Sequence, residues 1–169
     1  MSSFQLLSSV VRISWSPDGR YRVVGDYGIV IVWDAIKQRE FSFNAHDALD
    51  NTAIFGLDWL PDGTLVTSGG DYTICFWKLE NLQAKLLSTI YPPTLEIGHV
   101  KTDLNADKAT IEAALESFIN PNGHKAIVSA LATQGWLVAS GSADGFLKLW
   151  DARIPTSPKF IADVYKHTL

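Results

Sequence analysis

The chain has 169 residues, of which 47% are hydrophobic and 19% charged, and its net charge is −4. This apolar composition excludes an intrinsically disordered chain, and the absence of a basic run argues against nucleic acid as a partner. No stretch of the sequence approaches 18 uninterrupted apolar residues, so we expect no membrane-spanning helix and no membrane partner. The lone Cys75 excludes an internal disulfide and indicates an intracellular location, cytoplasmic or nuclear. We expect its side chain to fill space in the core.

The first unit of the chain begins with the alternating apolar residues Val11, Ile13 and Trp15, which predict a strand. The sequence PDG follows and predicts a tight turn, because proline presets φ and glycine accepts a positive φ. After a second strand, the apolar sequence IVIVW predicts a third strand that ends at Trp33. Residues 40–43 form a short fourth strand in this interpretation.

The second unit repeats this order. Alternating apolar residues from Ile54 to Trp59 lead into another PDG turn, and the sequence TICFW ends at Trp77 before a fourth stretch at 84–91. The sequences IVIVW and TICFW are apolar or small at nearly every position. Strands buried on both faces have this composition, so we expect both faces of these two strands to be covered.

Residues 92–122 separate the second unit from the third. Within them, the apolar spacing from Asp107 to Ile119 predicts one amphipathic helix, which the sequence NPNG ends. Two roles for this helix stay open, namely a decoration that covers the edge of a sheet and a helix that docks a partner, because insertions in repeat proteins often lie on the binding face.

The third unit contains the clearest internal repeat, because residues 137–153 closely resemble residues 65–79. When Trp150 is aligned with Trp77, Asp144 falls on Asp71 and Ser140 on Thr67. Repetition of a whole strand-turn-strand pattern is the signature of a repeat architecture. Each unit is therefore predicted to form four short antiparallel strands.

These units resemble the WD40-repeat family. Trp33 and Trp77 lie 44 residues apart, and Gly123-His124 precedes Trp150-Asp151 as a Gly-His precedes the Trp-Asp of a WD repeat. The resemblance implies an all-β fold of three β-propeller blades in an incomplete ring, since propellers have about 4–8 blades. A longer chain, a second copy or another propeller-completing chain would close the ring. Residues 1–169 are then a single partial propeller, with blade 1 at about 10–43, blade 2 at about 46–91, a helical insert at about 92–122 and blade 3 at about 123–169.

A Ser/His/Asp set in the third unit suggests a hydrolase when it is considered alone. Its repetition argues against catalysis, which needs one nucleophile. The WD40 resemblance instead implies a buried hydrogen-bond network in each blade. Aligned on Trp33, the first unit has Leu6, Val23 and Tyr27 at the three polar positions, with Asp26 one residue out of register. The two complete sets are His46, Thr67, Asp71 and Trp77, and His124, Ser140, Asp144 and Trp150.

The resemblance implies a non-catalytic scaffold for protein–protein interaction, a subunit of a multiprotein complex whose partners are other proteins. No His, Cys or Asp cluster has the spacing of a metal site, and we expect no cofactor.

A second interpretation of the function comes from Trp150 to Arg153, which resembles the WDxR motif of substrate receptors of cullin-RING ubiquitin ligases. In this interpretation Arg153 would contact the adaptor and Asp151 would support it. The third interpretation of the function is a propeller hydrolase. Candidate partner contacts beside the turns are Asp26, Tyr27, Asp47, Tyr72, Lys125 and Phe146.

Overall fold

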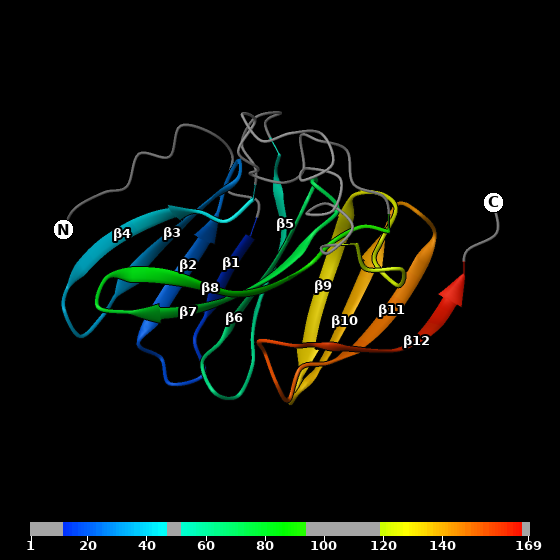
Figure 1. The fold of residues 1–169 in the computed structure, drawn as a ribbon. Helices are drawn as coiled ribbons and strands as arrows, with labels where there is room; N and C mark the ends of the chain where they lie inside the picture. The colour runs from blue at the N-terminus through cyan, green and yellow to red at the C-terminus, as the bar shows by residue number, and fades with distance from the viewer. Residues whose placement is uncertain (1–11, 47–51, 94–118, 167–169) are drawn as a thin grey trace, which may run out of the picture.

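The computed structural model describes residues 12–46, 52–93 and 119–166 (Figure 1). These ranges form three antiparallel four-stranded sheets, which we call blades 1, 2 and 3. Blade 1 contains β1 (Arg12–Trp15), β2 (Tyr21–Gly25), β3 (Ile29–Asp34) and β4 (Arg39–Asn44). Blade 2 contains β5 (Ile54–Trp59), β6 (Leu65–Gly69), β7 (Ile74–Glu80) and β8 (Gln83–Ile90). Blade 3 contains β9 (Val128–Gln134), β10 (Leu137–Ser142), β11 (Phe146–Asp151) and β12 (Lys159–Lys166).

The strands of each blade are ordered as they occur in the chain, so every connection within a blade is a hairpin. The blades meet through their first strands, because β5 contacts both β1 and β9 (Figure 1). The first strands therefore lie together at the inner edge of an arc, and the fourth strands form its outer edge. This is the arrangement of consecutive β-propeller blades, and it leaves blade 2 between the other two.

The hydrophobic core consists of two layers, one on each side of blade 2. In the layer shared with blade 1, Tyr21 stacks on Trp59 with ring centroids 6.4 Å apart, and Phe43 contacts Trp77 at 4.8 Å. In the layer shared with blade 3, Phe76 is fully buried in one cluster with Trp150. Stacked sheets bury the apolar faces that a single four-stranded sheet would expose to water.

The prediction that both third strands are buried on two faces is correct for β7 and wrong for β3. The first four residues of β7 are all buried, whereas β3 alternates between buried and less buried residues. Composition alone did not reveal this difference, because it depends on position in the arc. A blade covers each side of β7, but among the described residues only one side of β3 faces another blade.

The predicted helix from Asp107 to Ile119 is not confirmed. Residues 107–118 lie outside the described ranges, and Ile119 has no regular secondary structure. The two ends of the insert are adjacent, because a Cβ atom added to Gly123 would come within 3.0 Å of the Pro92 Cα. The chain therefore leaves blade 2 and enters blade 3 at one place, where only a glycine fits.

Replacing Phe76 with alanine tests the packing of blade 2 against blade 3. We expect Phe76→Ala to lower the free energy of unfolding by about 3–5 kcal/mol, because it opens a cavity in a fully buried layer. Urea unfolding followed by tryptophan fluorescence measures this loss. Ile36→Ala is the control, since Ile36 is 73% exposed and its truncation should change stability by less than about 0.5 kcal/mol. Equal effects of the two substitutions would contradict this packing.

Candidate functional site

The four polar residues predicted to act together in blade 2 lie within hydrogen-bonding distance of one another. We call them the His46 network. The Trp77 Nε1 donates to the Thr67 Oγ1 at 3.0 Å, and that hydroxyl lies 2.8 Å from the His46 Nε2. On the other side of the ring, the His46 Nδ1 donates to the Asp71 Oδ1 at 2.9 Å. The connection before β5, the strand β6 and the strand β7 are thus tied together by side chains.

Blade 3 has the same arrangement, which we call the His124 network. The Trp150 Nε1 donates to the Ser140 Oγ at 2.9 Å, and the His124 Nε2 lies 2.8 Å from the same oxygen. The His124 Nδ1 donates to the Asp144 Oδ2 at 3.0 Å. Ser140 and Trp150 are both completely inaccessible to solvent. The structure thus places both sets of four residues together, in the same order and with nearly the same distances.

Blade 1 has no such network among its described residues, and the structure corrects the alignment there. Strand pairing places Val24 opposite Ile31, which is the position that Thr67 and Ser140 occupy in their hairpins. The alignment on Trp33 had selected Val23, one residue too early, because the turn between β2 and β3 is shorter. Leu6 lies outside the described residues. An aliphatic residue at the hydroxyl position leaves the Trp33 indole without that acceptor.

Burial and hydrogen bonding act in opposite directions on the acidic residue of the His124 network. Burial alone would raise the pKa of Asp144, but the backbone N–H groups of Lys125 and Phe146 and the His124 ring lower it below its ordinary value. Burial is the main cause that lowers the pKa of His124. A neutral imidazole with its proton on Nδ1 can then donate to Asp144 and accept from the Ser140 hydroxyl.

Two buried polar contacts beside these networks were not predicted from the sequence. The Thr73 Oγ1 donates to Asp71 at 2.8 Å and lies 3.1 Å from the His46 Nδ1. In blade 3, the buried Lys148 donates to Asp163 at 2.8 Å, and its ammonium group lies 5.0 Å from the centre of the Phe146 ring. The Lys148–Asp163 pair could have been sought from the sequence, because a lysine inside the apolar sequence FLKLW indicates a buried charge, and a buried charge needs a partner.

Cys75 is buried beside the His46 network. Burial, together with the nearby charge of Asp71, raises the pKa of its thiol to about 12. A thiol with this pKa is protonated at neutral pH and is a poor nucleophile. The site therefore offers no reactive cysteine within the described ranges.

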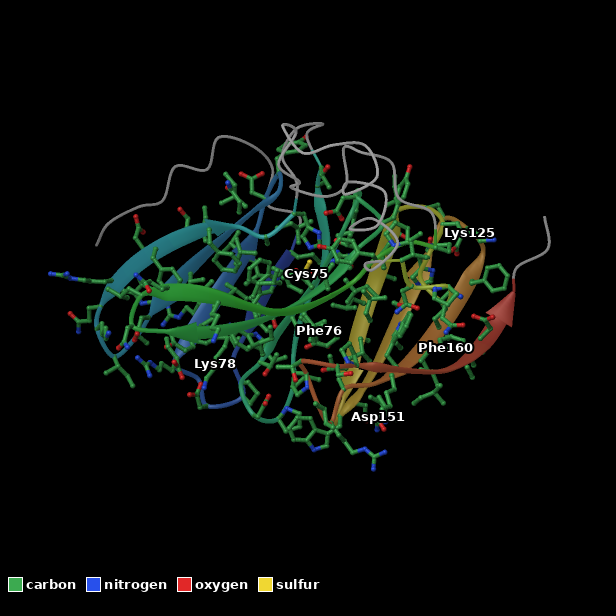
Figure 2. All side chains as sticks on the ribbon, viewed as in Figure 1. Cys75, Phe76, Lys78, Lys125, Asp151 and Phe160 are labelled. Carbon is green, nitrogen blue, oxygen red and sulfur yellow. The ribbon has the colours of Figure 1, made fainter. Side chains whose placement is uncertain are left out.

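The predicted partner contacts lie at two opposite ends of the blades. Tyr27 and Tyr72 lie in turns that join the second and third strands, and Phe146 is the first residue after such a turn. These turns lie at one end of the arc (Figure 1). Figure 2 shows Lys125 toward this end and Asp151 at the other. Asp26 is in the same turn as Tyr27, and Asp47 lies outside the described residues. We call the end that carries Tyr27, Tyr72, Lys125 and Phe146 the tyrosine face.

At the opposite end, Arg153 forms an ion pair with Asp151. The Arg153 Nε donates to Asp151 at 2.9 Å, and its backbone N–H donates to the same carboxylate at 3.0 Å. This pairing lowers the pKa of Asp151 to about 2. The guanidinium group is 74% exposed, so the pair is a surface feature that contributes little to stability.

The described ranges contain no helix with the length and apolarity needed to cross a bilayer. Within the same ranges, no three His, Cys, Asp or Glu residues are grouped so that they could hold a metal ion.

Three stacked four-stranded sheets, two of them tied by a Trp-hydroxyl-His-Asp network, define a set of β-propeller blades of the WD type. The sequence matches the family model described as "WD domain, G-beta repeat" over residues 5–34, 37–78 and 116–151. These segments make up more than half of the chain, which therefore belongs to the WD40-repeat family.

Curated relatives include insect proteins named "Ribosome biogenesis protein WDR12 homolog". The protein of Drosophila persimilis is 24% identical over 89% of this chain and 43% of its own length. That of Aedes aegypti is 30% identical over 63% of this chain and 28% of its own length. The chain thus spans less than half the length of the curated relatives it matches.

Solved structures show the same fold. The computationally designed Ika4 protein has a TM-score of 0.63 and 21% sequence identity, and the match covers 98% of this chain and 78% of that one. The structure of U3-55K has a TM-score of 0.61 and 19% identity, and the match covers 96% of this chain and 38% of that one.

These relatives do not support the ubiquitin-ligase interpretation of Trp150 to Arg153. Their printed names concern ribosome biogenesis, and the structure supplies a local reason for the short motif. Asp151 accepts hydrogen bonds from both the side chain and the backbone of Arg153, so the two residues close their own turn. The comparisons support an interaction scaffold rather than a ligase receptor.

Replacing His124 with alanine tests the His124 network. We expect His124→Ala to destabilise the protein by about 1–3 kcal/mol for each buried polar partner that it leaves unpaired. The double variant His124→Ala/Ser140→Ala should cost less than the sum of the single variants, because both remove one shared hydrogen bond. Chemical denaturation measures all three. The neighbouring exposed Lys125→Ala is the control, and strict additivity would contradict a coupled network.

The lowered pKa of His124 predicts a pH dependence of stability. The unfolded chain binds a proton near the ordinary histidine pKa of 6.5, whereas the folded protein resists protonation at this site until a lower pH. This contribution to stability is therefore complete above about pH 6.5 and decreases as the pH falls toward 5. We expect His124→Gln to flatten the pH dependence of the free energy of unfolding between pH 7 and 5.

This window lies above the ordinary Asp144 pKa of 3.8, so the carboxylate does not contribute to the change. An NMR titration of the wild-type His124 ring gives a second readout, which does not depend on the stability of the variant. A His124 ring that titrates at 6.5 or above would contradict the prediction.

Proposed function

We propose that this WD40 segment is a non-catalytic scaffold for protein–protein interaction and a subunit of a multiprotein complex that acts in ribosome biogenesis. The names of the curated relatives support the process, and membership of the WD40 family supports the scaffold. An intracellular location that includes the nucleus follows from this proposal, and the partners are other proteins.

The observation that carries the non-catalytic part is that the Ser/His/Asp set, which suggests a hydrolase, is buried and already hydrogen-bonded within the blade. A nucleophilic serine must reach its substrate, but Ser140 is completely inaccessible and its oxygen already accepts from Trp150. Thr67 is equally inaccessible and bonds to Trp77 in the same way. The polar groups hold strands together, which suits a rigid platform and leaves binding to the turns.

The tyrosine face is the part of the surface that we propose as the partner contact. Two of its turns, in blades 2 and 3, are held by the networks, since Asp71 and Asp144 accept hydrogen bonds from the backbone N–H groups of Thr73 and Phe146 where these turns end. Tyr27 is 50% exposed at this face. Exposed aromatic side chains are typical of protein–protein interfaces.

Co-sedimentation tests this function. A tagged chain is expressed in insect cells, since the curated relatives come from flies and mosquitoes, and the lysate is separated on a sucrose gradient. We expect part of the chain to move with preribosomal particles and to co-purify with proteins of those particles. Tyr27→Ala should reduce this fraction severalfold, whereas Ile36→Ala, an exposed residue at the other end of the blades, should not. A wild-type chain found only in the light fractions would refute the proposal.

A further inference from the structure

The side of blade 3 that faces away from blade 2 is an apolar surface, which we call the far face of blade 3. Strand pairing places Ala139 between Ala132 and Leu149, and Gly141 between Ala130 and Leu147. Side chains of paired residues project to the same side of a sheet. Leu137, on the same side, is 43% exposed. A row of small and aliphatic residues across three strands is the composition of a surface that packs against another sheet.

The side of blade 1 that faces away from blade 2, its far face, carries two tryptophans. Trp15 and Trp33 hold the positions that Trp59 and Trp77 hold in blade 2, because Trp15 precedes the same PDG turn and Trp33 ends the same strand. Trp59 and Trp77 are buried against blade 1. Trp15, in contrast, is 55% exposed. The far face of blade 1 thus repeats the surface through which blade 2 packs on its neighbour.

The far face of blade 3 repeats the other half of that same interface. Cross-strand pairing aligns Leu137 with Tyr21, since each lies opposite the aspartate of its Trp-Asp. By the same pairing, Leu149 corresponds to Val32. Tyr21 and Val32 are among the blade 1 residues that pack against blade 2, and Tyr21 stacks on Trp59. The remaining correspondences are Ala139 with Val23 and Leu147 with Val30.

The two far faces are therefore complementary to each other in the way that blades 1 and 2 are. We propose that the far face of blade 3 in one copy of this chain packs on the far face of blade 1 in a second copy, head to tail. Two such contacts join two three-bladed arcs into one closed ring of six blades, which lies within the range of about 4–8 known for propellers. A second copy is the occupant because one chain carries both halves of the contact.

One departure from the repeat also fits this arrangement. Arg22 stands where blade 2 has the buried Leu65, and its guanidinium group lies 4.4 Å from the centre of the Trp15 ring. Two copies of the far face of blade 1 would bring two Arg22 guanidinium groups together, and their repulsion favours head-to-tail pairing over the contact of two such faces.

Solution mass tests the proposal on the 169-residue chain itself. Light scattering coupled to size exclusion should give twice the chain mass of 18.6 kDa. Trp15→Glu and Leu137→Glu, both at exposed positions, should each give monomers that still fold, as circular dichroism checks. When mixed, these two variants should form a dimer, because each retains the face that the other lacks. Ile36→Glu is the matched control, and this variant should form a dimer as the wild-type chain does.

Cross-linking identifies the faces that meet. Trp15→Cys and Leu137→Cys are prepared separately, mixed and treated with a short bismaleimide; the native Cys75 is buried. We expect a covalent pair from the mixture and none from either variant alone. The mixture of Ile36→Cys and Ile154→Cys, two exposed positions away from the far faces, is the control.

Three results would overturn the proposal. A wild-type chain that stays monomeric at high concentration would show that another chain, or further blades of a longer one, covers the far faces. Cross-linking of a single variant with itself would show that identical faces meet. A dimer that survives both Trp15→Glu and Leu137→Glu would use another surface. None of these results bears on the scaffold function, whose test is co-sedimentation.

Discussion

The structure depends on a hydroxyl group that is shared between an indole and an imidazole. In blades 2 and 3, one oxygen, of Thr67 or Ser140, lies at 3.0 Å or less from both the tryptophan Nε1 and the histidine Nε2. Each of these polar groups is buried and would cost about 1–3 kcal/mol without its partner. Satisfied together, they fix the connection that enters a blade against its second and third strands. The turns that join the second and third strands of these two blades are therefore held in a defined position by the buried network.

Blade 1 has no such network among its described residues and is tied at its other end by an ion pair. The Asp34 carboxylate is fully buried and accepts from the Arg20 Nη2 at 2.9 Å. This hydrogen bond and those from the backbone of Ile36 and Lys37 hold the pKa of Asp34 below its ordinary value. The ion pair closes the end of the blade where the PDG turn lies, whereas the networks of blades 2 and 3 fix the opposite end. Blade 1 therefore depends on its contact with blade 2 for order near Tyr27.

The sequence predicted the all-β fold and the propeller blades because each blade is a local unit, and turn chemistry and apolar spacing are read along the chain. It also pointed to the residues of both networks, because the hydroxyl and the aspartate recur at the same spacing before Trp77 and Trp150, and the WD40 resemblance implied the histidines. What it missed depends on position in the assembled arc. The exposure of one side of β3, the pairing of Lys148 with Asp163 and the register of Val24 are set by neighbouring strands and blades rather than by local pattern.

The adjacency of Pro92 and Gly123 has a consequence for how this propeller segment can vary. Because the two ends of the insert already meet, the blades impose no required length on the chain between them. The entropy of closing a loop rises only slowly with its length, by about 0.6 kcal/mol for each doubling. The junction of Pro92 and Gly123 is therefore a natural point for grafting a new binding element onto the scaffold.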